Sequence, residues 1–193
     1  MKANFIQRAL AYLLDIFIIS FIFSIITIGF KPNTEIEKKY NEVYDNYIKG
    51  EITAEQYLDE YTDVLYDMQK ANALPNAINT VLIIVYFIVF QYLNKGQTIG
   101  KKLLKIKIVN EDKKDISLKQ MLIRGIMIYL ILSSLINIIL FFNVSRKVYM
   151  TSYLLIDGIE TLILFLSAIF ILYRNDKKAL HDIVSKSIVI KEN

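Results

Sequence analysis

The sequence predicts an all-α membrane protein: a four-helix transmembrane bundle with an extracytoplasmic helical hairpin and a small cytoplasmic two-strand element. Three observations predict this fold. Hydrophobic residues make up 54% of the 193 residues, and the mean hydropathy is +0.39. These residues are gathered into long blocks instead of being spread at amphipathic spacing. Lysines and arginines lie beside the blocks, as they do at the cytoplasmic face of a bilayer.

Four segments are long enough to cross a membrane. A hydrocarbon core about 30 Å thick needs roughly 20 apolar residues in a helix. The expected spans are about residues 9–30, 77–93, 121–142 and 153–173. The first is not expected to be a signal peptide, because its apolar run is too long, it contains Asp15, and no small-residue cleavage site follows it. Residues 1–193 are therefore expected to form one membrane domain, with residues 31–76 as an extracytoplasmic helical insertion.

The distribution of positive charge predicts the orientation of the chain. Short loops rich in lysine and arginine stay on the cytoplasmic side. The segments before the first span, between the second and third spans, and after the fourth span carry most of these residues. We therefore expect a multi-pass protein of the cell membrane with both termini in the cytoplasm.

The long connection between the first and second spans carries twice as many acidic residues as lysines. Tyrosines and aliphatic residues recur in it at helical spacing on either side of Gly50, which predicts a helical hairpin. Thr34 with Glu37 matches the capping-box pattern that begins a helix, and so does Thr53 with Gln56. Each helix has a tyrosine-rich face and an acidic face. One interpretation is packing between the helices or on the membrane surface, and the other is a cap that binds a partner or ligand.

Composition excludes several classes of protein. The chain has no cysteine and one histidine, so cysteine chemistry and a multi-histidine metal site are excluded. The net charge of +4 is not accompanied by base-stacking aromatics among the lysines, so nucleic-acid binding is not expected. Only serine or acid chemistry remains for a hydrolase, and no nucleophile has an assigned base. We expect no enzymatic activity, no metal and no cofactor.

Three short segments carry a resemblance to a known family. Residues 96–109 read GQTIGKKLLKIKIV, residues 178–184 read KALHDIV, and residues 7–11 read QRALA. With Asp15 in the first span, the chain resembles the RDD family of small bacterial membrane proteins. The resemblance implies that the family's arginine and two aspartates correspond to Arg8, Asp15 and Asp182. One departure is Ser185-Lys186, where the family commonly has a small residue followed by glycine.

The family resemblance does not imply one function. Sodium/proton antiport has been attributed to one member of the family, while others look like accessory or regulatory proteins. A function for this chain therefore has to be argued from its own residues.

Arg8 and Asp15 are the first candidate site. They are seven residues apart, which puts them on nearly the same helix face and about 10 Å apart along the axis. An ionised carboxylate in an apolar helix is costly, so Asp15 should face the bundle interior and find a cation, an arginine or a proton. Two interpretations stay open: an ion- or proton-binding site with Arg8 as charge partner, and a structural salt bridge. Asp182 is the third candidate of this set.

The other spans carry secondary candidates. Asp157 and Glu160 are one turn apart, and two like charges at that spacing repel each other and favour a shared proton. They also lie in the first turns of the predicted fourth span, where acids suit the helix dipole and reach water. Three uncharged candidates, Asn79, Gln91 and Asn137, suit interhelical hydrogen bonds or cation binding. His181 suits either a cytoplasmic turn or the transfer of protons.

The loop after the second span carries a motif made of Gly96, Gln97, Thr98, Gly100, Lys101 and, farther on, Arg124. It lacks the spacing of a phosphate-binding loop, so we interpret its glycines as turn or close-packing positions. Apolar residues and lysines mostly alternate over residues 103–109, and β-branched residues fill residues 187–191. These two segments are predicted to pair as strands of a small cytoplasmic sheet.

Two functional hypotheses follow. The leading one is a transport or ion-coupling protein that exchanges a cation for a proton through a buried Arg8/Asp15 site. Four spans enclose little space, so a pathway would need self-association or a partner subunit. The alternative is an accessory or regulatory protein that binds a membrane enzyme or complex through its acidic hairpin or its basic loop. The expected partners are the lipid bilayer, a monovalent cation or proton, and a second copy or a membrane partner protein.

Overall fold

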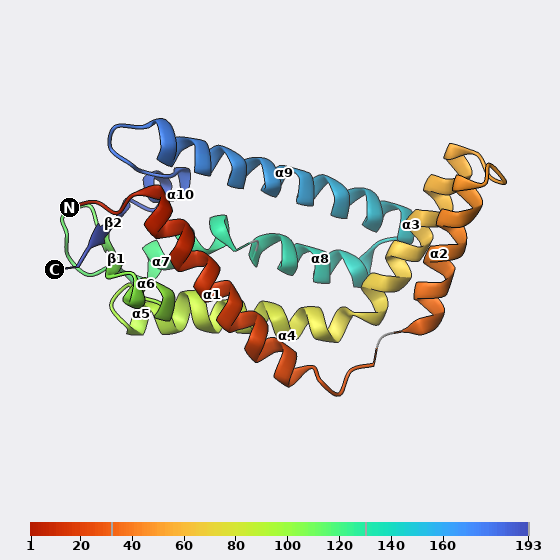
Figure 1. Cartoon of the computed structure of the whole chain (residues 1–193), viewed down its shortest axis with the longest axis horizontal. Coiled ribbons are helices and arrows are strands. Elements are labelled where there is room, and N and C mark those ends of the chain that lie inside the picture. Colours follow the sequence, from red (N-terminus) through yellow and green to blue (C-terminus); the bar gives the residue numbers. More distant parts are fainter. Residues whose placement is uncertain (32, 130, 193) are drawn as a thin grey trace.

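The computed structural model of the chain describes residues 1–31, 33–129 and 131–192. Long helices lie side by side along its length (Figure 1). A helical hairpin lies at one end, and a two-stranded sheet lies at the opposite end together with both termini (Figure 1). The fold is mostly helical, as the sequence predicts.

Within the described residues, three helices are long and apolar enough to cross a membrane. They are α1 (Phe5–Ile26), the continuous run of α4 (Ala73–Ile84), η1 (Val85–Phe90) and α5 (Gln91–Leu93), and α9 (Arg146–Tyr173). Each begins several residues before its predicted start. The cause in α1 is Asn4, whose side chain accepts from the Gln7 amide in a capping box, so the helix starts ahead of the apolar run.

The predicted third span, residues 121–142, is not one straight helix. The segment forms two helices, α7 (Leu118–Ile128) and α8 (Ile131–Asn143). Each is too short to cross a membrane alone, and the two are bent by 69° at their junction. The chain's path through residue 130 lies outside the described residues. A run of apolar residues shows that a segment is buried in lipid or protein, but it carries no signal for the direction in which the segment turns.

The hairpin consists of α2 (Thr34–Ile48) and α3 (Ala54–Ala71). Tyrosines join the two helices, with Tyr47 stacked on Tyr57 at 4.6 Å between ring centroids. The predicted cap at Thr53 is confirmed. The predicted cap at Thr34 is wrong, because Asn33 caps the helix one residue earlier by accepting from the Ile36 amide.

The sheet pairs the two segments that the sequence predicts. Strand β1 (Ile106–Asn110) runs antiparallel to β2 (Ser187–Lys191), with Ile108 opposite Val189. The short helices α6 (Ile99–Leu103) and α10 (Leu180–Val184) lead into these strands. Lys186 forms the turn before β2 with a φ of 50°, so a lysine adopts there the left-handed conformation that glycine ordinarily provides.

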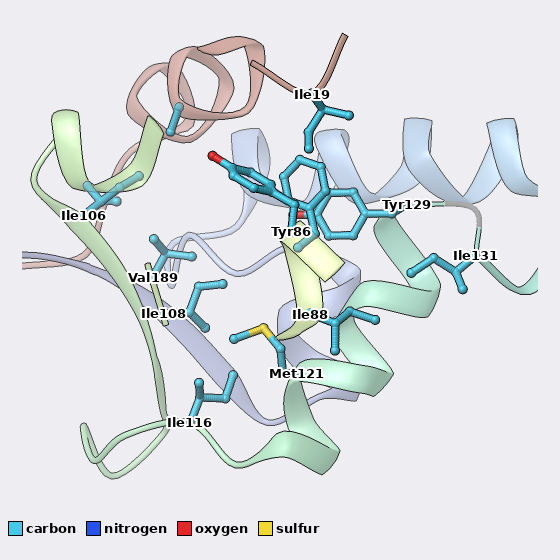
Figure 2. Packing of buried hydrophobic residues seen from close by; sticks show 13 residues of the cluster. Ile19, Tyr86, Ile88, Ile106, Ile108, Ile116, Met121, Tyr129, Ile131 and Val189 are labelled. Atoms are coloured by element: carbon cyan, nitrogen blue, oxygen red, sulfur yellow. The ribbon is translucent and has the colours of Figure 1, made fainter. Parts of the chain in front are cut away.

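The hydrophobic core lies at the sheet end of the helices (Figure 2). Phe87 of η1 is fully buried and stacks on Tyr129 at 3.9 Å between ring centroids. Ile108 and Val189 cover this cluster from the sheet, and Met121 covers it from α7. The core therefore fixes the sheet against the ends of three helices.

Candidate functional site

Arg8 and Asp15 do not form the predicted pair. Both side chains lie on α1, but Arg8 forms an ion pair with Asp182 at 2.5 Å, whereas the nearest cationic group to Asp15 is the ammonium of Lys101 at 3.8 Å. Their spacing in the sequence does not decide their partners. Each charge pairs with a residue that is distant in the sequence. The two residues belong to separate clusters.

The Asp15 cluster joins α1 to the loop motif. The Asp15 carboxylate is fully buried and accepts hydrogen bonds from the Tyr86 hydroxyl at 2.7 Å, the Thr98 hydroxyl at 2.5 Å and the Gly100 amide at 2.7 Å. These donors come from η1 and from the first turn of α6. With Lys101 beside it, the carboxylate is hydrogen-bonded on both oxygens, which is how a buried charge is stabilised.

Lys101 supplies the positive charge of this cluster. Burial lowers the pKa of its ammonium to about 8, and the Asp15 charge opposes that shift. Lys101 therefore stays protonated at neutral pH. Its ammonium also lies 6.0 Å from the centre of the Phe87 ring.

The glycines of the motif allow close approach, as the sequence predicts. A Cβ on Gly100 would lie 2.3 Å from the Ala11 carbonyl oxygen, and one on Gly96 would lie 2.1 Å from the Ile108 carbonyl oxygen. Gly96 also has a φ of +90°. The buried amide of Gln91 donates to the Gly96 carbonyl at 3.2 Å, and Gln97 donates to the Ile106 carbonyl at 3.1 Å. These contacts hold the loop on the helix ends.

The Asp182 cluster joins four elements. The fully buried Asp182 carboxylate pairs with Arg8 of α1 and Arg124 of α7, and it accepts from the Ala179 amide at the start of α10. Arg124 also donates to the Ser187 hydroxyl of β2 at 2.8 Å. Burial alone would raise the pKa of Asp182, but the two arginines outweigh it and hold the pKa below the ordinary range. The carboxylate is therefore ionised and fully paired.

His181 connects α10 to the end of α9. Its Nδ1 lies 2.8 Å from the Ser167 hydroxyl, and its Nε2 lies 3.6 Å from Asp182. Burial and, second to it, the nearby Arg124 lower the pKa of the imidazole to about 3, so the ring is neutral at pH 7. A proton on Nε2 faces the carboxylate and leaves Nδ1 to accept from Ser167. This contact is structural, because Ser167 is buried and two arginines already occupy Asp182.

The remaining candidates meet in another part of the molecule. A cavity of about 440 Å³ lies between α4, α8 and α9, near the hairpin. Four of the secondary candidates line it: Asn79, Asn137, Asp157 and Glu160. Sequence spacing paired only Asp157 with Glu160, and the structure adds the two asparagines from the neighbouring helices.

The cavity holds acids without a cationic partner. No described residue forms an ion pair with Asp157 or Glu160. The Asn137 carbonyl oxygen is buried and makes no hydrogen bond to any described residue. In the described part of the chain, no three histidine, cysteine, aspartate or glutamate side chains gather as a metal-binding group. The cavity thus contains two acids without an ion-pair partner among the described residues, unlike the two saturated clusters at the sheet end.

Sequence reasoning missed several residues of both regions. Tyr86 is one, and its signal was a hydroxyl inside an otherwise apolar block. Tyr149 and Tyr153 also line the cavity, although the sequence analysis placed Tyr149 outside the fourth span. That helix begins at Arg146, which brings its first two turns to the cavity wall.

The described residues form apolar helices long enough to cross a membrane. Saturated ionic clusters lie at one end of them, and a cavity lined by two acids lies between three of them. These features define a helical membrane protein. The chain belongs to the RDD family, whose sequence model matches residues 2–186. No curated protein and no solved structure matched the chain in the other two comparisons.

The charge assignment predicts the outcome of two double-mutant cycles. Arg8→Gln and Asp15→Asn share no partner, so their effects on the free energy of unfolding should add to within about 0.5 kcal/mol. Arg8→Gln and Asp182→Asn remove two ends of one ion pair, so their coupling should exceed about 1 kcal/mol. Thermal melts in detergent measure both. Rescue of Arg8→Gln by Asp15→Asn would contradict the assignment.

Gly100→Ala should destabilise the protein by at least about 2 kcal/mol, because the new methyl group meets backbone and the Asp15 carboxylate. Gly158→Ala is the matched control. Nothing lies within 4 Å of a Cβ there, so it should leave stability unchanged or raise it by about 0.5–1 kcal/mol. Equal melting temperatures for the two variants would be evidence against the close approach of α6 to α1.

His181 should make the protein less stable in acid. Its folded pKa is about 3 against an ordinary value of 6.5, so the unfolded chain binds the proton first and stability falls as pH drops below 6.5. The slope should reach up to about 1.4 kcal/mol per pH unit. In the His181→Gln variant, the plot of stability against pH should be flatter between pH 6.5 and about pH 4.5. This range lies above the pH at which Asp182 takes up its proton. An unchanged slope in the variant would remove His181 as the cause.

Proposed function

We propose that the protein binds a cation or a proton in the cavity between α4, α8 and α9, as a transport-type or ion-coupling membrane protein. The observation that supports this is the pair Asp157 and Glu160 on an apolar helix, with no cationic side chain of the described chain paired to either. Intramembrane acids face water-filled cavities and mark ion or proton pathways. A bound cation or proton would supply the positive charge that these two acids lack.

The depth of the two acids supports the same proposal. α9 has 28 residues and is about 42 Å long. Asp157 lies eleven residues from its start, about 17 Å along the axis. A hydrocarbon core of about 30 Å leaves roughly 12 Å of the helix outside it. Even if all of those roughly 12 Å project on the hairpin side, Asp157, at about 17 Å, lies inside the hydrocarbon core. An unpaired charge is costly there.

The cavity walls offer ligands suited to a cation. Carboxylate, amide and hydroxyl oxygens are the groups that bind hard cations. Glu160 and Asp157 supply the charge, and Asn79, Asn137 and Thr80 supply neutral oxygens from the facing helices. The ordered hydroxyl of Thr80 already donates to the Asn76 carbonyl at 2.9 Å, which leaves its lone pairs to accept or coordinate.

The proposed site replaces the Arg8/Asp15 site that the sequence favoured. The oxygens of Asp15 are occupied by three hydrogen-bond donors, so a cation there would have to displace part of the fold. Arg8 is equally committed, because it binds Asp182 and donates to the Lys177 carbonyl at 2.9 Å. Both residues serve better as architecture than as ligands.

For the topology we propose four spans in the cell membrane, with α7 and α8 as the broken third span. Both termini and the sheet would be cytoplasmic, and the hairpin and the cavity mouth extracytoplasmic. The lysine-rich connections at the sheet end support this orientation. A pathway across the whole bilayer would use a second copy or a partner subunit, because the cavity lies only in the hairpin half of the bundle.

An accessory protein that binds a membrane enzyme through its hairpin is the alternative. The hairpin is engaged within the chain, however. Arg146 of α9 pairs with Asp63 at 3.0 Å and Asp67 at 3.1 Å, and it lies 4.8 Å from the centre of the Tyr66 ring. One side of the hairpin is therefore occupied by α9 and not open to an external partner. We propose no enzymatic activity, since the buried Ser167 near His181 has no open approach for a substrate.

The test is the dependence of the melting temperature on cations. The wild type should be stabilised by cations, by about 2.7 kcal/mol at a hundredfold excess over Kd. The double variant Asp157→Asn/Glu160→Gln should lose that dependence and, without cations, be at least as stable as the wild type. Asp59→Asn, an exposed acid of the hairpin, is the control. A double variant that still responds to cations like the wild type would refute the proposed site.

A further inference from the structure

We infer that the ligand of this cavity is an organic ammonium ion with N–H donors and an apolar body, not a bare metal ion. The inference rests on the proposed function, since it names the class of cation that the same site takes. It is carried by three features that meet in one cavity: its volume, its aromatic wall and its set of acceptors.

The cavity is too large for a bare monovalent cation. Its volume of about 440 Å³ equals the share of on the order of fifteen water molecules in the liquid. That size falls within the range of about 300–1,000 Å³ typical of small-molecule sites. An alkali-metal ion would contact one wall and leave the rest to water, whereas a molecule with several carbon atoms reaches both walls.

The wall next to the acids is aromatic. Phe141 and Phe142 of α8, with Tyr149 and Tyr153 of α9, line the cavity. Tyr149 packs edge-on against Phe141 at 5.4 Å and lies 6.1 Å from Tyr153, so the rings support each other. Aromatic rings attract ammonium ions through the negative charge on their faces and bury apolar groups well. A small hydrated metal ion gains little from such a wall.

The acceptors favour an ammonium that still carries hydrogens. Asp157 and Glu160 line the cavity and provide the opposite charge. A primary ammonium has three N–H donors that can donate to carboxylate oxygens. A quaternary ammonium has no such donor and would leave the carboxylates without hydrogen bonds, at a cost in affinity.

The ammonium could come from a free amine or from the headgroup of phosphatidylethanolamine, and both share this chemistry. The cavity is lined by the hairpin-side parts of three apolar helices, so a lipid of the adjacent leaflet is one source to test. The experiment therefore needs one arm with soluble amines and one with defined lipids.

The first arm compares matched ligands on the full-length protein in detergent at pH 8. The probes are 2-phenylethylamine, its neutral analogue 2-phenylethanol, tetramethylammonium and sodium, each added in a melting assay and by calorimetry. We expect saturable protection of the protein by 2-phenylethylamine, at least about tenfold tighter than by the other three. Phosphatidylglycerol nanodiscs with and without phosphatidylethanolamine form the second arm. If the headgroup supplies the ammonium, phosphatidylethanolamine should raise the melting temperature of the protein. Added 2-phenylethylamine should then give no further increase.

Variants link the binding to the cavity. Asp157→Asn and Glu160→Gln should each weaken amine binding by about tenfold or more, while Asp59→Asn binds as the wild type does. Sodium protection that depends on Asp157 and Glu160, with no added effect of amines, would overturn this inference and leave the proposed function standing. Equal binding of the amine and the alcohol would also overturn it. Absence of any dependence on Asp157 and Glu160 would overturn both. The comparison of ligands on the wild type needs no variant to fold.

Discussion

The shared carboxylate of Asp182 is the interaction on which the sheet end of the molecule depends. Arg8, Arg124 and the Ala179 amide all converge on it, so one buried group fixes the start of α1, the start of α10 and the middle of α7. Removing one member would leave an unpaired charge in a closed environment, which is far costlier than losing a surface ion pair. The Asp15 cluster then locks the neighbouring loop to α1 in the same way. These paired charges therefore hold the sheet and the helix ends together.

The same electrostatic rule separates architecture from function in this protein. At the sheet end every acid within the bundle has its donors, and the partners come from elements far apart in sequence. At the hairpin end, the acids of α9 face a cavity instead. The RDD family model covers both regions of the chain. Our proposed site lies at the cavity because no described residue forms an ion pair with its two acids.

Local pattern was sufficient for the elements whose information is local. The alternation of residues 103–109 with the β-branched residues 187–191 predicted the sheet, and Gly96 and Gly100 were correctly taken as turn and packing positions. It failed where partners are remote. Spacing on one helix suggested Arg8 as the partner of Asp15. The actual partner of Arg8 is Asp182, which is remote in the sequence, and no local pattern indicates that contact. The 69° bend between α7 and α8 is similarly invisible, since apolar composition does not encode direction. The convergence of Asn79 and Asn137 on Asp157 and Glu160 required the helix packing itself.

The unbroken length of α9 has a mechanical consequence. One continuous helix carries Arg146, which pairs with the hairpin, then the two cavity acids, and near its far end Ser167, which contacts His181. A tilt of this helix about its middle would move its two ends in opposite directions. The same helix therefore connects the contacts of the hairpin to those of His181, beside the Asp182 cluster.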